Sequence, residues 1–188
     1  MLIVHPITPE RWHDLEQLFG PRGACGGCWC MWFRLPRRDY EAGRGERNRR
    51  ALHALVHSGS PPGLLGYAAN EPVAWCSVAP RTEYRRLLAS RTMRPIDDLP
   101  AWTIICLFVS RQHRRKGYSV EMIRAACSFA QDAGAALVEA YPIQPKSNDV
   151  PPIFASQGTL AAFLAAGFAP VAQPSTGRIL VRWHPPSR

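Results

Sequence analysis

The segment LFVSRQHRRKGYS, residues 107–119, decides the fold of this chain. It closes an apolar run over residues 102–109, typical of a strand covered on both faces. It then opens a helix whose apolar positions repeat at helical spacing from Gly117 to residue 133. Backbone N–H groups at a helix start lack intrahelical partners and carry partial positive charge. With the basic residues before Gly117 they predict an anion site that suits a pyrophosphate. A basic helix start that only faces solvent is the alternative interpretation.

Helices and strands alternate outward from this segment. Strands are predicted over residues 2–6, 66–69, 73–79, 102–109, 136–141, 168–172 and 178–183, and helices over residues 8–19, 39–57, 117–133 and 158–166. Residues 70–72 predict a hairpin turn, and residues 80–100 and 142–152 an irregular segment and a loop. The order β-α-α-β-β-β-α-β-α-β-β predicts an α+β fold, with a mixed, mostly antiparallel sheet of about six to seven strands flanked by helices. The 188 residues fit one domain over residues 1–188.

The deciding segment resembles the acyl-CoA motif of the GNAT N-acetyltransferase family. In that motif a strand ending in Leu-x-Val leads to Arg/Gln-x-x-Gly-x-Gly/Ala. Here Leu107 and Val109 precede the pattern Arg114-x-x-Gly117-x-Ser119. Ser119 in the last small position is a departure from the family pattern.

A second match lies downstream, where Phe163-Leu-Ala-Ala-Gly167-Phe168 is similar to the family's Tyr-x-x-x-Gly-Phe. The order of helices and strands over residues 64–183 also agrees with a GNAT fold, and the first 60 residues agree only in their β-α-α order. The resemblance implies direct transfer of an acetyl or similar acyl group from acetyl-CoA or another acyl-CoA to an amine of a small molecule, without an acyl-enzyme. It implies that cofactor contacts come from Leu107, Phe108, Val109, Arg114, Arg115, Lys116, Gly117, Tyr118, Ser119 and Ser156.

The acid and base of such a reaction are less clearly marked. Phe163 stands where many relatives have a Tyr that protonates the leaving thiolate, and residues 103–106 lack the family's common Glu. Tyr141 is the best substitute acid, and a packed aromatic with a bonded hydroxyl is its alternative role. The base is water or a carboxylate such as Glu83, Asp97 or Asp98. Cys106 in the central strand leaves open a covalent route.

An aromatic loop over residues 25–34 stands where the resemblance places the acceptor. We expect the acceptor to contact Trp29, Trp32, Phe33 and Trp75. A hydrophobic plug over one end of the sheet is the alternative. The same loop holds Cys25, Cys28 and Cys30, but no second CxxC or HxxxH pair follows at zinc-site spacing. We therefore predict no metal and reduced thiols.

The chain carries a net charge of +9, and all but two of its 23 basic residues are arginines. Two Arg-rich segments stand out, residues 34–50 and residues 81–94. A basic protein favours polyanions, so two alternatives stay open: a GNAT-fold transferase that takes its acyl group from aminoacyl-tRNA, and a sensor that binds acyl-CoA without turnover. A basic surface without a partner is the third. No apolar stretch is long enough to span a bilayer and no secretory signal is evident, so we expect no membrane contact and a cytoplasmic location. The sequence does not decide between a monomer and a homodimer.

Overall fold

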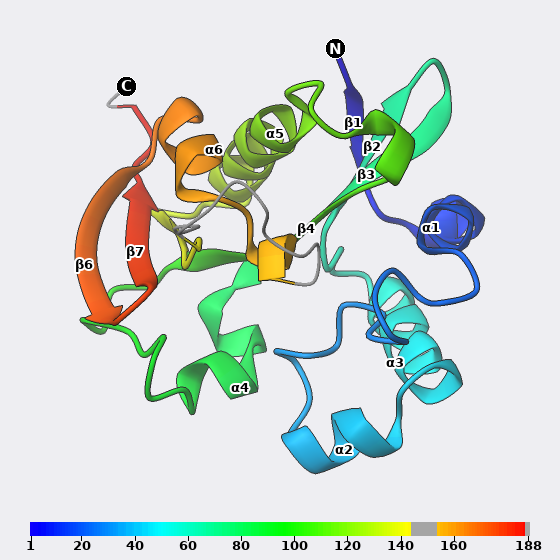
Figure 1. The fold of residues 1–188 in the computed structure, drawn as a ribbon, viewed down its shortest axis with the longest axis horizontal. Helices are drawn as coiled ribbons and strands as arrows, with labels where there is room; N and C mark the ends of the chain where they lie inside the picture. Colours follow the sequence, from blue (N-terminus) through cyan, green and yellow to red (C-terminus); the bar gives the residue numbers. More distant parts are fainter. Residues whose placement is uncertain (144–153, 187–188) are drawn as a thin grey trace.

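A computed structural model describes residues 1–143 and 154–186. Its centre is a seven-stranded sheet in the order β1-β2-β3-β4-β5-β7-β6 (Figure 1). The parallel pair is β4 with β5, and the other neighbours are antiparallel. The strands are β1 (Ile3–Pro6), β2 (Leu64–Ala68), β3 (Glu71–Pro80), β4 (Trp102–Val109), β5 (Val138–Ala140), β6 (Ala169–Ser175) and β7 (Arg178–Trp183).

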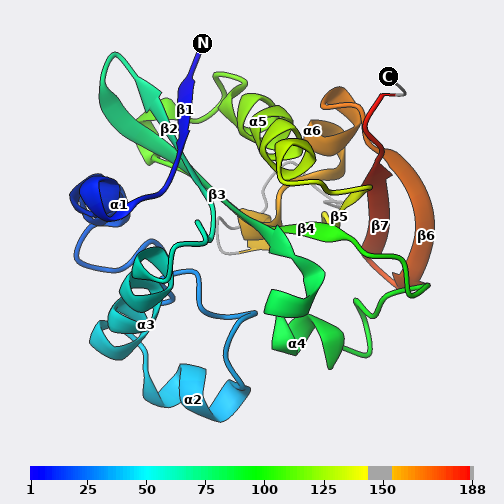
Figure 2. The same ribbon diagram turned by 180° about the vertical axis from the view of Figure 1, so that it is seen from behind.

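Helices cover both faces of this sheet, with α5 and α6 on one side and α1 to α4 on the other (Figures 1 and 2). The α-helices are α1 (Trp12–Phe19), α2 (Arg37–Ala42), α3 (Glu46–His57), α4 (Arg85–Leu88), α5 (Tyr118–Asp132) and α6 (Leu160–Ala165). Short 3-10 helices are η1 (Pro9–Arg11), η2 (Arg81–Glu83), η3 (Arg111–His113) and η4 (Phe154–Gln157). The predicted fold class and the predicted order of the seven strands are confirmed.

The core forms on both faces because neighbouring strand residues point to opposite sides. On β3, Ala74 and Cys76 pack in the cluster that includes Met122 and Ile123 of α5. Trp75 packs on the other side, among the apolar residues of α1, α3 and the loop after α1. Apolar side chains of helices and loops cover both faces of the sheet. We therefore look for a ligand site at the loops and strand ends.

Three local predictions were wrong. The helix predicted over residues 39–57 is two helices. The helical conformation is interrupted over residues 43–45, where Gly45 takes φ +85°. The hairpin turn lies at Ala69 and Asn70, both at positive φ, and residues 71–72 already belong to β3. Residues 80–100 contain η2 and α4 instead of being wholly irregular. Of the described helices, none has the length and apolarity that crossing a bilayer requires.

Candidate functional site

A gap in the sheet beside β4 is the first feature of the site. β4 pairs with β5 only through residues 102–104. On its other side the register with β3 shifts between Ser77 and Val78, which makes Ile105 an extra residue in β4. A bulge of this kind bends a strand. Within the described part of the chain, residues 105–109 have no strand partner on the β5 side. Their backbone N–H and C=O groups form an edge to which an extended ligand can hydrogen-bond.

The short helix η4 lies beside β4 at this edge. Gly158, which follows η4 at φ +76°, approaches so closely that a Cβ there would lie 2.8 Å from Leu107 Cδ1. Ser156 lies in η4 and is partly exposed. The structure therefore brings the predicted contacts on β4 and Ser156 to one edge, although they are far apart in the sequence.

The turn between η3 and α5 presents backbone donors. Gly117 is the N-cap of α5 at φ +79°, and a Cβ built on it meets no atom within 4 Å. The N–H groups of Val120 and Glu121 donate to the Gly117 carbonyl. By contrast, the N–H groups of residues 114–119 find no acceptor among the residues that the structure describes. Donors at a helix start with open space in front of them form an anion site.

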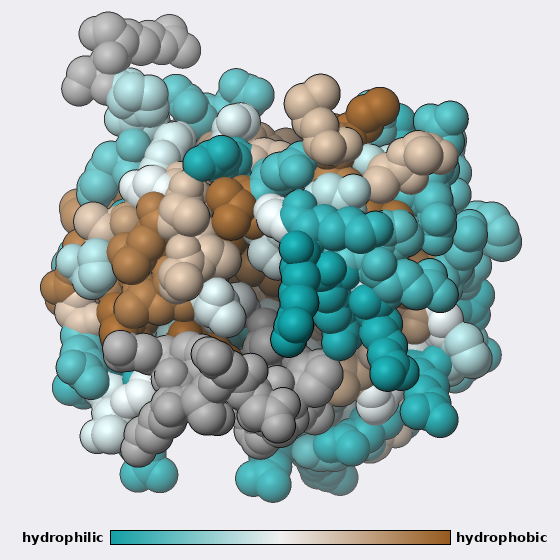
Figure 3. Space-filling view, turned by 45° about the horizontal axis from the view of Figure 1, so that its top comes forward, coloured by the Kyte–Doolittle hydropathy of each residue, from teal (hydrophilic) through white to brown (hydrophobic). Residues whose placement is uncertain are grey.

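Cationic side chains surround these donors. Arg114, Arg115 and Lys116 are exposed, and Arg114 Nε donates to the Val109 carbonyl at 3.2 Å, which ties the turn to the end of β4. The turn lies at the top of Figure 1. With that side brought forward, hydrophilic residues cover a continuous area beside hydrophobic ones (Figure 3). The strand edge and the cationic turn thus adjoin, as an acyl chain attached to a pyrophosphate requires.

Comparison with known proteins identifies this arrangement. The family model described as "Acetyltransferase (GNAT) family" matches residues 29–149. The chain belongs to the GNAT acetyltransferase family. No curated protein sequence matches the chain.

Solved structures show the same fold. PaiA N-acetyltransferase from Thermoplasma acidophilum, in complex with coenzyme A, is similar at 11% identity and TM-score 0.54, over 98% of this chain and 99% of that one. A GNAT acetyltransferase from Streptococcus agalactiae is similar at 11% identity and TM-score 0.58, over 99% and 96%. A Drosophila melanogaster polyamine N-acetyltransferase, which forms N-acetylagmatine, is similar at 11% identity and TM-score 0.55, over 98% and 100%. At these identities the likeness supports the GNAT fold and leaves the acceptor open.

Tyr141, the predicted acid of this GNAT chain, lies just beyond β5 and is 1% exposed. Its hydroxyl donates to Glu139 Oε1 at 3.4 Å. Burial and the Glu139 carboxylate raise the pKa of Tyr141, so the phenol holds its proton. This hydrogen bond is what the alternative role, a packed aromatic, requires. The proton-donor role stays a prediction.

Glu139 is a buried carboxylate that the sequence analysis missed. It is 0% exposed, and it accepts hydrogen bonds from Arg81 at 3.3 and 3.4 Å and from Arg182 at 3.3 Å. Arg182 also binds the Asp97 carboxylate at 2.7 and 2.8 Å, and Arg81 donates to the carbonyls of Asp97 and Leu99. Two arginines and two carboxylates therefore pair with one another in this network, and only Nε of Arg182 is left without a partner among their buried atoms in the described structure. Of the three predicted bases, Asp97 is held in this network and Asp98 is exposed.

Glu83, the third predicted base, lies on the side of the sheet that carries the aromatic loop. Its carboxylate is 3.4 Å from Arg34 Nη1, and its side chain is 50% exposed. Arg34 is 5% exposed at its side chain, and it also donates to Tyr84 Oη at 3.4 Å. A half-exposed carboxylate fixed by a buried cation faces solvent next to the loop.

The predicted acceptor aromatics separate into two groups. Trp29, Phe33 and Trp75 are buried, with Trp75 0% exposed and in edge contact with the ring of Phe19. Trp32 is partly exposed and packs where the two apolar clusters on this face meet. Trp32 is therefore the most exposed of the four predicted aromatics, although Trp29 also lines a surface pocket beside α1. The acceptor role of all four residues stays a prediction.

The two Arg-rich segments meet at Trp32. The Arg86 guanidinium lies 3.5 Å from the Trp32 ring centroid, and the Arg86 backbone N–H donates to the Phe33 carbonyl at 3.0 Å. Burial, and next the charge of Arg37, lower the pKa of Arg86. Nη1 of Arg86 and Nε of Arg34 are buried without a partner in the described structure. The Arg86 guanidinium, which keeps one buried donor without a partner in the described structure, thus lies against the partly exposed Trp32 ring.

The cysteines of the loop do not converge. Cys25 and Cys28 are partly exposed, and Cys28 donates to the Gly23 carbonyl at 3.5 Å. Cys30 is buried and accepts a hydrogen bond from Trp75 Nε1 at 3.4 Å. Over residues 1–143 and 154–186, no three His, Cys, Asp or Glu side chains are arranged to hold a metal ion.

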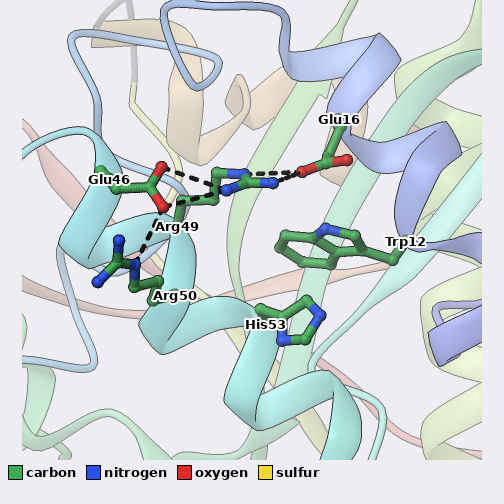
Figure 4. Close-up of a pocket in the computed structure, with 6 residues that line it drawn as sticks. All are labelled: Trp12, Glu16, Glu46, Arg49, Arg50 and His53. Carbon is green, nitrogen blue, oxygen red and sulfur yellow. Dashed lines mark hydrogen bonds and ion pairs between the residues drawn. The ribbon is translucent and has the colours of Figure 1, made fainter.

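A surface pocket between α1 and α3 was not predicted from the sequence (Figure 4). It encloses about 340 Å³ and is lined by Trp12, Glu16, Glu46, Arg49, Arg50 and His53. Arg49 Nε donates to Glu16 at 2.7 Å, and Arg49 Nη1 donates to Glu46 at 3.1 Å. Because its carboxylates are already paired with arginine, the pocket offers little unpaired charge to a ligand.

Proposed function

We propose that this GNAT chain transfers an acetyl or similar acyl group from acyl-CoA to an amine of a small molecule, directly and within a ternary complex. The observation that carries the proposal is the junction of β4 and α5. There a strand edge that has no strand partner among residues 1–143 and 154–186 runs into a turn that carries N–H groups and exposed cations, with open space at Gly117. An adenylated, phosphate-containing chain needs both halves of this arrangement.

Each half has its own task in the proposed reaction. Arg114, Arg115 and Lys116 would hold the phosphates together with the N–H groups up to Ser119 and Tyr118. The backbone of residues 107–109, with Ser156 opposite, would hold the pantetheine arm, and a β4 N–H would polarise the thioester carbonyl. Fixing the carbonyl next to the amine supplies much of the acceleration.

Proton transfer completes the scheme. The amine loses a proton as it attacks, and we assign the base to Glu83, since it is the half-exposed carboxylate beside the aromatic loop. We assign the acid to Tyr141, whose retained proton would pass to the departing thiolate. Because Tyr141 is buried just beyond β5, the thioester must reach the point where β4 and β5 separate for this transfer.

The acceptor that suits the loop carries an anionic group as well as its amine. The support is the Arg86 guanidinium over the Trp32 ring, together with the charge of Arg37, which acts on Arg86. A carboxylate accepts paired hydrogen bonds from guanidinium, and a planar group stacks on an indole. The same cations also fit the second candidate, in which aminoacyl-tRNA is the acyl donor. Affinity for tRNA that falls steeply with salt would favour that candidate.

Thermal unfolding with and without acetyl-CoA tests the main proposal. A ligand at 100 times its Kd stabilises the folded state by about 2.7 kcal/mol, which corresponds to a rise in Tm of about 5–10 °C for a domain of this size. Arg114→Ala/Gly117→Asp should abolish the rise, and Arg111→Ala, on an exposed residue of the same turn, should keep it. No rise with acetyl-CoA or longer acyl-CoAs would refute the proposal. A rise without turnover of any amine would indicate a sensor.

A further inference from the structure

Arg178 of β7 lacks the carboxylate partner that the buried arginines of the described structure have. Arg34, Arg81 and Arg182 are buried, and each forms an ion pair with a glutamate or an aspartate. Arg178 is partly buried, yet no carboxylate in the described part of the chain pairs with it. Burial lowers the pKa of Arg178. A cation withdrawn from water without a counter-ion costs free energy, so the site favours an anionic ligand.

The Arg178 guanidinium is fixed in place but keeps free donors. Its Nη1 donates to Oε1 of Gln157 in η4, and Nε2 of Gln157 donates to Met93 Sδ at 3.4 Å. Nε and Nη2 of Arg178 donate to no acceptor in the described structure, and neither is among its buried unpartnered atoms, so both reach solvent. Two N–H donors on one edge of a guanidinium match the two oxygens of a carboxylate.

The strand pairing places Arg178 beside Tyr141, the proposed acid. Ala140 pairs with Val181, and Ile143 pairs with Arg178, so the ladder continues beyond β5 without an inserted residue. Residues two apart on a strand share a face. Arg178 therefore lies diagonally from Tyr141, at roughly 7–8 Å. An anion bound to Arg178 would be held close to the proposed point of transfer.

Backbone hydrogen bonds join Arg178 to the gap beside β4. The N–H of Ile143, its strand partner, donates to the Gly158 carbonyl at 3.1 Å, and the Leu160 N–H donates to the Ile143 carbonyl at 3.0 Å. Gly158 in turn lies close to Leu107 of β4. Arg178 is thus linked, through two described segments, to the strand edge at which the pantetheine arm is proposed to bind.

Arg178 faces the side of the sheet that carries the aromatic loop. Its partner Gln157 contacts Met93, and Met93 packs in one apolar cluster with Phe33 of that loop. The turn with the N–H donors of residues 114–119 leads instead into α5, which packs on the opposite face. An anion at Arg178 would therefore belong to the acceptor, whereas the phosphates of acyl-CoA would bind at the turn.

We propose that Arg178 determines the specificity for the acceptor by binding a carboxylate that the acceptor amine carries. This inference rests on the proposed function and names its substrate class, the amino carboxylates, to which the free amino acids belong. Arg86 presents the face of its guanidinium to Trp32, whereas Arg178 presents a free edge, which is the side that pairs with a carboxylate. An amine of the same shape without the carboxylate would be a poor substrate.

Carboxylate binding is tested first in the wild type, without acyl-CoA. The Nε–H resonance of the Arg178 side chain, assigned by triple-resonance NMR, is followed as sodium benzoate is added, with benzyl alcohol as the neutral control at matched ionic strength. Benzoate should move this resonance, and benzyl alcohol should not. A resonance that benzoate leaves in place, or that both probes move equally, would overturn the proposal. This result depends neither on turnover nor on how a variant folds.

Turnover then tests Arg178 in the proposed reaction. Acetyl transfer from acetyl-CoA is compared for the free amino acids and the matching amines without the carboxylate, such as L-phenylalanine and phenethylamine. Arg178→Gln should lower kcat/KM for the carboxylates roughly 10- to 100-fold, the effect of losing hydrogen bonds to a charged group, and should change it little for the matching amines. Arg94→Gln, at an exposed arginine next to Met93, is the matched control and should behave as the wild type.

The outcomes separate this inference from the proposed function. The rise in Tm with acetyl-CoA should persist in Arg178→Gln, because the cofactor contacts are left intact. Equal losses of kcat/KM for both members of a pair, or a wild type that prefers the amines without a carboxylate, would overturn the role of Arg178. If acetyl-CoA fails to raise the Tm of the wild type, the proposed function is refuted, and the benzoate titration still decides whether Arg178 binds a carboxylate.

Discussion

Replacing Glu139 by glutamine should destabilise the fold by about 3 kcal/mol. The carboxylate is 0% exposed and accepts from Arg81 and Arg182. Removing one partner of a buried ion pair costs about 3–5 kcal/mol, because the remaining charge is left uncompensated. Here both arginines keep other acceptors, the carbonyls of residues 97 and 99 and the Asp97 carboxylate, so the lower end applies.

The assay is unfolding followed by circular dichroism, with heat and with urea. A loss of about 3 kcal/mol corresponds to a fall in Tm of about 6–12 °C in a domain of this size. Glu71→Gln is the control, since Glu71 is exposed on β3 and a surface change costs within about 0.5 kcal/mol. If Glu139→Gln costs less than about 1 kcal/mol, the buried charges are not holding these strands together and the reasoning fails.

Three further outcomes are expected. The hydrogen bond from Arg182 lowers the pKa of Asp97, so the stability that it gives is present above the ordinary carboxyl pKa of about 3.9 and is lost as pH falls through the lowered pKa. In urea unfolding, the difference in the free energy of unfolding between wild type and Asp97→Asn should shrink below about pH 4. A difference that stays unchanged down to pH 2 would contradict this. Tyr141→Phe should lower kcat by about 10²-fold if Tyr141 is the acid, with a modest fall in Tm from the lost hydrogen bond to Glu139. An unchanged kcat would leave Tyr141 a packing residue. Trp32→Ala should raise KM for an anionic amine several-fold and leave KM for acetyl-CoA unchanged, as measured by steady-state kinetics with both substrates varied. A raised KM for acetyl-CoA with an unchanged KM for the amine would contradict this.

The parts of the fold that the sequence predicts are those determined by neighbouring residues. The strand over residues 102–109, the turn and the helix from Gly117 form one local pattern of apolar run, basic glycine turn and helical periodicity, and the structure follows it closely. The break between α2 and α3 was also readable, since Gly43 and Gly45 are strong helix breakers. The long helical pattern around them obscured it.

The buried charges could not be predicted in the same way. Glu139 sits in an otherwise apolar strand, and its partners lie 58 residues before it and 43 after it. No local pattern links residues so distant. The pairing of β5 with β7 places Glu139 opposite Arg182, and η2, which follows β3, carries Arg81. The cysteines show the same limit. Cys28 and Cys30 are close in sequence, yet Trp29 and Cys30 take positive φ, and the Cys30 sulfur accepts a hydrogen bond from Trp75 of β3.

The network around Glu139 has a consequence for the order in which the protein is made. Arg81 and Glu139 leave the ribosome first, and Arg182 of β7 follows Glu139 by 43 residues. At about 5–20 residues per second, that interval lasts about 2–9 s. During it the nascent chain can pair Glu139 with Arg81 alone, and β5 lacks its neighbour β7. Glu139 therefore gains its second arginine partner only after β7 has been synthesised, and the buried ion pairs of this sheet cannot be complete before then.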